Sequence, residues 1–186
     1  FQAALTHGHP TALAASDLTA RAVADLASGV APRELVARLK DYALSQRVIY
    51  HERWLGDLWR KSAAGAPDEF IARGWDECLD SLERLEAALA RPNSDADPCL
   101  ATGQGWVAEE ALATGLLCFL LTPDDPRRAL QRAAATSGDS DSIASLAGSF
   151  AGARHGMRAW PADWPARIEY ADRLDGLARA LIKISS

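Results

Sequence analysis

The sequence lacks the residue patterns that mark thiolate metal sites, nucleic-acid surfaces and membrane spans. Its three cysteines, Cys78, Cys99 and Cys118, lie far apart and form no C-x-x-C pair, so neither a disulfide framework nor a zinc ribbon is indicated. No run of five basic residues occurs and the net charge is −5, which argues against a nucleic-acid surface. The longest apolar run, near residues 111–121, is too short to span a bilayer. We therefore expect a cytoplasmic protein that binds neither nucleic acid nor membrane.

Two metal motifs of helical enzymes are also missing. His51 and Glu52 begin like the metalloprotease motif H-E-x-x-H, but Leu55 takes the place of the second histidine. No E-x-x-H occurs anywhere, so a di-iron helical bundle is not indicated either. The acidic residues of the long segment 68–90 alternate with arginines and are interpreted as a solvated face.

What the sequence does contain is a series of segments with helical periodicity and no convincing strand pattern. Hydrophobic residues make up 48% of the 186 residues, enough for a sizeable core, and the length fits one domain over residues 1–186. We predict an all-α fold. The expected helices are 12–27, 33–44, 47–61, 68–90, 107–121, 127–135, 143–156 and 167–184. The last of them is expected to pack through an apolar stripe that includes Leu174 and Leu177.

The stretch from Gly138 to Gly156 stands out from the other segments. Its apolar residues, Ile143, Leu146, Ala147 and Phe150, recur at the spacing of one helix face. Gly148, Gly152 and Gly156 recur every fourth residue on the other side, and a helix-interior glycine costs about 1 kcal/mol relative to alanine. We interpret these glycines as the site of a close helix contact, and this segment as the central helix of the domain.

The residues at the start of this segment suggest a metal site. Asp139 and Asp141 can converge if the first lies in the turn before the helix and the second in its first turn. Together with the hydroxyl of Ser142 they form an all-oxygen set suited to Mg²⁺ or Mn²⁺. The alternative is a simple capping cluster. A calcium loop is excluded because the central glycine and the closing glutamate are absent.

The run Gly138-Asp-Ser-Asp-Ser-Ile-Ala-Ser-Leu-Ala-Gly-Ser-Phe-Ala-Gly-Ala-Arg-His-Gly156 resembles the signature of the ADP-ribosylglycohydrolase family, the relatives of dinitrogenase-reductase-activating glycohydrolase. That family carries G-D-[ST]-D-[ST]-I-A-x-x-A-G-x-x-x-G-A-x-x-G at the second half of its dinuclear metal site. The resemblance implies a compact orthogonal helical bundle that binds two divalent cations, Mg²⁺ or Mn²⁺. It also implies that Asp139, Asp141 and Ser142 are metal ligands, which we now prefer to the capping cluster.

The same resemblance extends to two shorter segments. Thr6-His7-Gly8-His9-Pro10 is similar to the family's T-H-x-[HDN]-P, which implies that His7 contacts ADP-ribose; the alternative is a histidine that caps its own helix. The segment that begins at Gly105 and Trp106 is similar to G-[YW]-V-x-[DE]-[STE]-[LA], whose aromatic residue borders the ADP-ribose pocket. The following Glu109 and Glu110 are either outer-shell residues of the site or surface residues, and we prefer the second interpretation.

These resemblances imply a hydrolase that cleaves the glycosidic bond between ADP-ribose and a modified protein side chain or small acceptor. A non-catalytic ADP-ribose-binding or structural helical protein is the alternative, and an oligomerising helical fragment is a further one. The family's N-terminal T-D-D segment, which supplies the other metal ligands, does not occur in the sequence, which begins at Phe1. We therefore expect the C-terminal half of such an enzyme, inactive by itself and prone to associate through the uncovered surface. The general base, the choice between Mg²⁺ and Mn²⁺, and the acceptor (arginine, serine or a small molecule) are left open by these residues.

Overall fold

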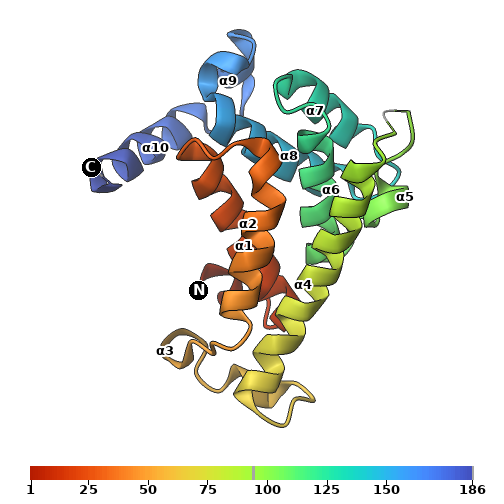
Figure 1. The fold of residues 1–186 in the computed structure, drawn as a ribbon. Coiled ribbons are helices and arrows are strands. Elements are labelled where there is room, and N and C mark those ends of the chain that lie inside the picture. Colours follow the sequence, from red (N-terminus) through yellow and green to blue (C-terminus); the bar gives the residue numbers. More distant parts are fainter. Residues whose placement is uncertain (94, 186) are drawn as a thin grey trace.

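The structure is a computed structural model that describes residues 1–93 and 95–185 of the chain. Within these residues it consists of helices and contains no strand, which confirms the all-α prediction (Figure 1). The elements, with η for 3-10 helices, are η1 (Gln2–Leu5), α1 (Pro10–Ala27), α2 (Pro32–Gln46), α3 (Glu52–Leu55), η2 (Leu58–Lys61), α4 (Pro67–Ala90), α5 (Cys99–Thr102), α6 (Ala108–Leu120), α7 (Pro126–Ala134), α8 (Ser140–His155), η3 (Met157–Ala159), α9 (Asp163–Arg167) and α10 (Ala171–Ser185). None of the helices in this part of the chain combines the length and the apolar character of a membrane span.

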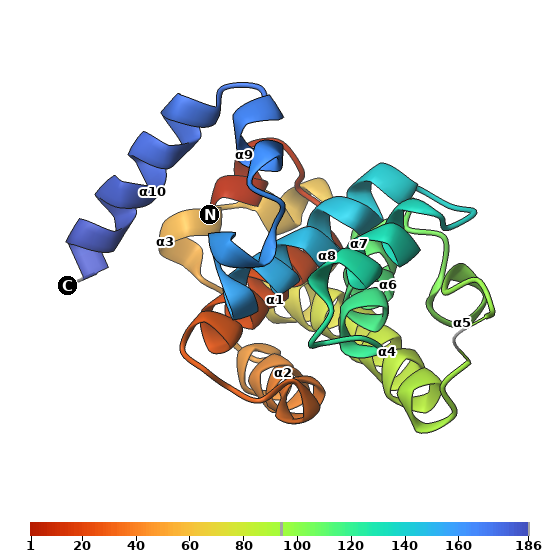
Figure 2. The same ribbon diagram turned by 90° about the horizontal axis from the view of Figure 1, so that it is seen from above.

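The central helix of the bundle is α6. Every residue from Ala111 to Phe119 is buried, because α1, α4, α7 and α8 all pack against this helix (Figures 1 and 2). A helix that is buried all round must be apolar or small all round, and the sequence of α6 meets this requirement. The prediction that α8 is the central helix is therefore wrong.

Helix α8 is exposed to solvent on one face, unlike a central helix. Asp141, Ser145 and Ser149 are exposed, whereas Ile143, Ala147, Phe150 and Ala151 are buried. The interpretation of its glycines as a close helix contact is also wrong: a Cβ at Gly152 or Gly156 would meet no atom within 4 Å, and one at Gly148 would make only an ordinary contact, 3.5 Å from Leu130. The small residue between the two helices is Gly115 of α6, where a Cβ would lie 2.9 Å from that of Leu146.

Another close approach joins the start of α1 to the middle of α4. A Cβ at Gly74 would overlap the backbone carbonyl of Pro10, so glycine is required for the two helices to lie at this distance. Beside this contact the buried hydroxyl of Thr11 donates a hydrogen bond to the carboxylate of Glu77. The first turn of α1 is therefore fixed on α4 by backbone contact and by a side-chain bond.

The expected helix over residues 47–61 is interrupted. Gly56 has φ = 54°, which ends α3 after Leu55, and the chain re-forms as the short 3-10 helix η2. The spacing of Trp54, Leu58 and Trp59 is helical across this break, which explains why the sequence predicted one helix. Tyr50, Leu58 and Trp59 nevertheless pack against the core from these short elements.

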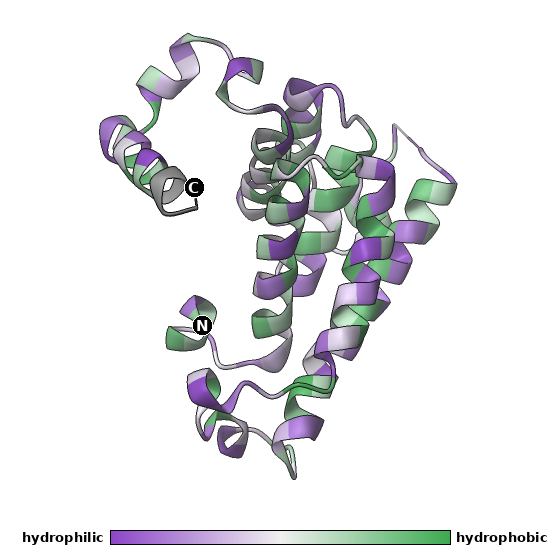
Figure 3. Ribbon diagram, turned by 60° about the vertical axis from the view of Figure 1, so that its left-hand side comes forward, coloured by the Kyte–Doolittle hydropathy of each residue, from purple (hydrophilic) through white to green (hydrophobic). Residues whose placement is uncertain are grey.

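The last helix forms but does not pack as predicted. It begins at Ala171 rather than at Arg167, and it extends away from the bundle with its main contacts on α9 (Figures 2 and 3). Leu174 and Leu177, expected in a buried stripe, are 51% and 57% exposed. The amphipathic pattern therefore predicted the helix correctly and its packing wrongly.

The glycine contacts give a matched pair of substitutions. We expect Gly74→Ala to lower the free energy of unfolding by about 1–3 kcal/mol, because its methyl group overlaps the Pro10 backbone. We expect Gly152→Ala to raise it by up to about 1 kcal/mol, because the added methyl group meets open space and alanine is the better helix former. Urea unfolding of both variants and the parent measures these changes, and equal values for the two variants would contradict the packing described for Gly74.

Candidate metal and substrate site

The carboxylates of Asp139 and Asp141 lie at the N-terminal end of α8. Asp139 is the N-cap residue, with φ = −73° and ψ = 69°, and Asp141 is in the first turn. The carbonyl of Asp139 accepts the N–H of Ile143 at 3.0 Å, but its side chain accepts no capping hydrogen bond. This geometry argues against the capping-cluster alternative, because the carboxylate that would serve as the cap is not used for it.

The two carboxyl groups converge. The pKa of Asp141 is lowered, chiefly by a hydrogen bond with the side chain of Asp139 and then by the N–H groups of Ser142 and of Asp141 itself. Asp141 is exposed, while Asp139 and Ser142 are half-buried. The arrangement anticipated from the sequence, with one aspartate before the helix and one inside it, is therefore the one that forms.

The donor set formed by these residues fits a hard divalent cation in part. Two carboxylates and the hydroxyl of Ser142 are oxygen donors, the kind that Mg²⁺ and Mn²⁺ prefer over nitrogen or sulfur. Within residues 1–93 and 95–185, however, no group of three or more His, Cys, Asp or Glu side chains is placed to hold a metal ion. Residues 139–142 therefore offer a portion of a coordination sphere.

A glycine-containing loop, residues 103–106, lies directly against this turn. The N–H of Asp139 donates to the carbonyl of Gln104 at 2.7 Å, and a Cβ at Gly138 would overlap that same carbonyl. A Cβ at Gly105, where φ is 80°, would lie 3.6 Å from the Cβ of Asp139. The structure thus brings Gly105 next to the aspartates.

Trp106 follows in the same loop and is open to solvent. Its side chain is 69% exposed, and its indole N–H donates to the side-chain oxygen of Gln104 at 3.2 Å. The aromatic face is available beside Asp139 rather than buried in the core. That position is compatible with a ring that borders a ligand.

The loop is held from the other side by α6. The carboxylate of Glu110 accepts the N–H of Gln104 at 3.0 Å and that of Gly105 at 3.2 Å. The hydroxyl of Thr114 donates to the carbonyl of Gly103 at 2.9 Å. The preferred interpretation of Glu110 as a surface residue is wrong, because the residue is half-buried and its carboxylate is bound to the backbone of the loop; the other interpretation, an outer-shell residue, stays a prediction. The available signal was a glutamate at the third position of a helix, which is placed to reach back to preceding N–H groups.

Asp97 holds the chain in place just before the turn at residues 138–139. One carboxylate oxygen accepts the N–H of Cys99 at 3.0 Å, and the other accepts the N–H of Ser137 at 3.1 Å. Burial acts to raise the pKa of Asp97, but hydrogen bonds from Ser137 and Cys99 outweigh it and leave that pKa below its usual value. Asp97 was not predicted from the sequence, although an aspartate bonded to the N–H two residues later is a common turn signal.

His7 is not brought to the aspartates by any hydrogen bond among the described residues. It is exposed, and its ring bonds the hydroxyl of the adjacent Thr6 at 2.9 Å. The histidine that caps α1 is His9, whose Nδ1 accepts the N–H of Thr11 at 3.4 Å. The capping role considered for His7 is therefore performed by His9, and the His7 ring takes no part in the cap.

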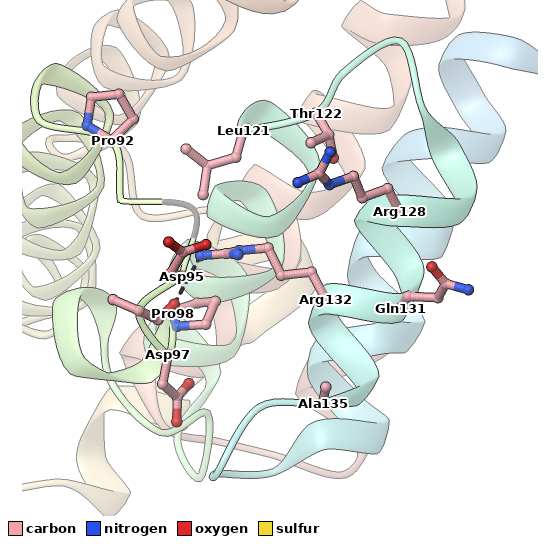
Figure 4. A pocket seen from close by; sticks show the side chains of 11 residues that line it. Pro92, Asp95, Asp97, Pro98, Leu121, Thr122, Arg128, Gln131, Arg132 and Ala135 are labelled. Carbon is pink, nitrogen blue, oxygen red and sulfur yellow. Dashed lines mark hydrogen bonds between the residues drawn. The ribbon is translucent and has the colours of Figure 1, made fainter.

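A hollow of about 720 Å³ is lined by Asp97, by its neighbours among residues 92 and 95–98, by the end of α6 and by α7 (Figure 4). Arg128 and Arg132 project into it from α7 (Figure 4), and Arg132 donates to the carbonyls of Asn93 and Ala96 at 2.9 Å each. None of the predicted site residues lines this hollow. The candidate site at the start of α8 is therefore separate from this hollow.

Comparison with known proteins points to one family. The model of the ADP-ribosylglycohydrolase family matches residues 1–186. ADP-ribosylhydrolase ARH3 of Danio rerio is 39% identical over 89 residues, and that of Bos taurus is 34% identical over 92 residues. These alignments cover 42% and 44% of this chain but only 24% and 25% of the relatives, so the matched part spans about a quarter of their length. No solved structure matches the chain significantly.

The contacts of Asp97 predict a pH-dependent stability. Because its folded-state pKa is lowered, the ionised carboxylate stabilises the fold above the ordinary pKa of 3.8, and this contribution is lost as the pH falls through the folded pKa. We expect Asp97→Asn to be less stable than the parent at pH 6, and the difference to shrink below about pH 4. Unfolding free energies between pH 2 and 7 test this, with the exposed Asp80→Asn as the control. If the difference in unfolding free energy between Asp97→Asn and the parent does not change with pH, the role of the ionised carboxylate is contradicted.

Proposed function

The chain belongs to the ADP-ribosylglycohydrolase family, and from this we propose that the protein hydrolyses the glycosidic bond between ADP-ribose and a modified protein side chain or small acceptor. The name of the ARH3 relatives, ADP-ribosylhydrolase, supports the same reaction class. The observation that carries the proposal is the placement of Asp139 as the N-cap residue and Asp141 in the first turn of α8, with no capping hydrogen bond to the Asp139 side chain.

We propose Asp139, Asp141 and Ser142 as ligands of two divalent cations, Mg²⁺ or Mn²⁺. Such ions, when bound, supply Lewis acidity and hold ribose hydroxyls and a water near the anomeric carbon. The residues of this chain contribute two negative charges and a hydroxyl on a turn whose backbone is fixed by Gln104 and Asp97. Fixed ligands matter because a displacement of about 1 Å at such a site lowers the rate severely.

Gly105, Trp106 and His7 are proposed to bind ADP-ribose. At Gly105 a Cβ would lie 2.9 Å from the side chain of Ile143, so glycine lets the loop backbone lie against the start of α8, beside Asp139. Trp106 offers an exposed aromatic face, on which a planar group can stack. His7 has an exposed ring at the start of α1 that can donate a hydrogen bond to a ligand oxygen.

The proposal includes three broader features that follow from the family and the composition. Residues 1–186 are proposed to form one domain, the partner is proposed to be an ADP-ribosylated protein or an ADP-ribose derivative, and the location is proposed to be cytoplasmic. The last is supported by three buried cysteines that are free rather than disulfide-bonded.

Asp141→Asn tests the metal assignment directly. We expect it to weaken Mg²⁺ or Mn²⁺ binding and to lower hydrolysis by orders of magnitude in the full-length protein, because a charged ligand is lost and the ion is displaced. The matched control is Asp172→Asn, which removes another exposed carboxylate from the first turn of a helix, α10. Calorimetric titration with Mn²⁺ and a hydrolysis assay give the result, and helical content is compared by circular dichroism. Unchanged titration and turnover would overturn the assignment.

The number of donors predicts how the 186-residue chain behaves by itself. Asp139, Asp141 and Ser142 provide about three oxygens, while each Mg²⁺ takes about six ligands. We therefore expect weak metal binding and no hydrolysis of ADP-ribosylated arginine or serine substrates. Adding a segment that bears T-D-D, in cis or as a separate chain, is expected to restore both together.

Two other outcomes would change the interpretation. Metal-dependent turnover by the 186-residue chain without any added segment would show that its site is complete. Tight ADP-ribose binding without turnover, even after the segment is added, would instead favour the alternative of a non-catalytic binding protein.

A further inference from the structure

Glu110 connects the start of α6 to the loop beside the aspartates. It occupies the third position of α6, after Ala108 and Glu109, and its side chain points back along the chain rather than out to solvent. One carboxylate oxygen, Oε2, accepts two backbone N–H groups, from Gln104 and Gly105. The same side chain fills the space that a Cβ at Gly103 would need.

The loop that Glu110 holds is also the one that fixes Asp139. The N–H of Gln104 is bound by Glu110, and its carbonyl accepts the N–H of Asp139 at 2.7 Å. Because one peptide segment is bonded on both sides, a shift of the loop must shift the backbone of Asp139. The overlap that any Cβ at Gly138 would make with Gln104 leaves this turn little freedom to compensate.

At the third position of α6 a glutamate holds the loop better than a serine or an amide side chain would. Its reach allows the carboxylate to span from the first turn of α6 to two consecutive N–H groups that have no helical partner. A charged acceptor also forms stronger hydrogen bonds than a neutral one, so the loop is held more firmly than by a serine or an amide. Glu109 is its neighbour in sequence, and no hydrogen bond to the loop is formed by that side chain in the described residues.

We propose that Glu110 is a positioning residue of the proposed metal site. It contacts neither metal nor substrate; it fixes the Gln104 carbonyl and, through it, the direction in which Asp139 presents its carboxylate. This inference rests on the proposed function, since it assigns the residue to the same site. The competing view is that Glu110 only stabilises the start of α6.

The experiment uses the 186-residue chain with Glu110→Ala, Glu110→Gln and the control Glu109→Ala. Two properties are measured: amide hydrogen exchange by NMR at Gln104, Gly105 and Asp139 of this chain, and Mn²⁺ affinity by calorimetry after the T-D-D segment has been added. For Glu110→Ala we expect exchange at all three amides to be faster by roughly tenfold or more, because two charge-assisted bonds are lost. We expect Mn²⁺ affinity to fall by about 10- to 100-fold, as is usual when the support of a metal ligand is removed.

The other two variants separate positioning from folding. Glu110→Gln keeps an acceptor oxygen, so it is expected to recover part of the protection and affinity, and it carries the same comparison if Glu110→Ala fails to fold. Glu109→Ala is expected to match the parent in both properties. Faster exchange at Gln104 and Gly105 with unchanged exchange at Asp139 and unchanged Mn²⁺ affinity would overturn the proposal. Equal acceleration of all amides in the core would also overturn it, since that is the signature of global destabilisation.

Failure of this inference can be distinguished from failure of the proposed function. If the parent chain binds no Mn²⁺ even with the T-D-D segment added, the metal assignment fails. The exchange of the Asp139 amide then still decides whether Glu110 controls that backbone. If Mn²⁺ binds and Asp141→Asn abolishes the binding while Glu110→Ala leaves it unchanged, the function stands and the positioning role is rejected.

Discussion

The hydrogen bond from the N–H of Asp139 to the carbonyl of Gln104 is the constraint on which the candidate site depends. It joins the loop before α6 to the turn before α8, so the first turns of the two helices lie side by side. The contact is possible only because residue 138 is glycine, since any side chain there would overlap Gln104. Further along the same helix pair, Gly115 allows Leu146 to approach, so two glycines on different elements set the separation of α6 and α8.

The sequence predicted those parts of the fold that depend on local periodicity. The predicted helices 12–27, 33–44, 68–90 and 127–135 agree within a few residues with α1, α2, α4 and α7, each of which begins with a proline. The prediction failed over residues 47–61, where the apolar spacing continues across Gly56 although the backbone turns there. It failed again for the glycines of α8, because a periodic glycine pattern looks the same whether a neighbour fills the space or solvent does. The sequence also could not predict whether α10 packs on the bundle, because an amphipathic pattern specifies a helix and its apolar face but not what that face contacts.

The residues of the candidate site also differ in whether their contacts are local in the sequence. Asp139, Asp141 and Ser142 are close in the chain, so their convergence followed from helix geometry alone and could be predicted. Glu110 and Asp97 act through backbone N–H groups of other segments, and those partners are known only once the segments are packed together. His7 belongs to a third class: its assignment came from resemblance, and the structure places it at the start of α1 without a bond to the aspartates.

The four carboxylates around this turn have different partners, and the difference indicates where a cation belongs. Asp97 and Glu110 each accept two backbone N–H groups, so their negative charges are compensated by the dipoles of the chain. Asp139 and Asp141 instead face each other, and among the described residues no ion pair with a basic side chain involves either of them. Two adjacent carboxylates repel each other unless a proton or a cation lies between them. The proposed divalent ion belongs at this inner pair, because it would neutralise two adjacent negative charges that no basic side chain of the described residues compensates.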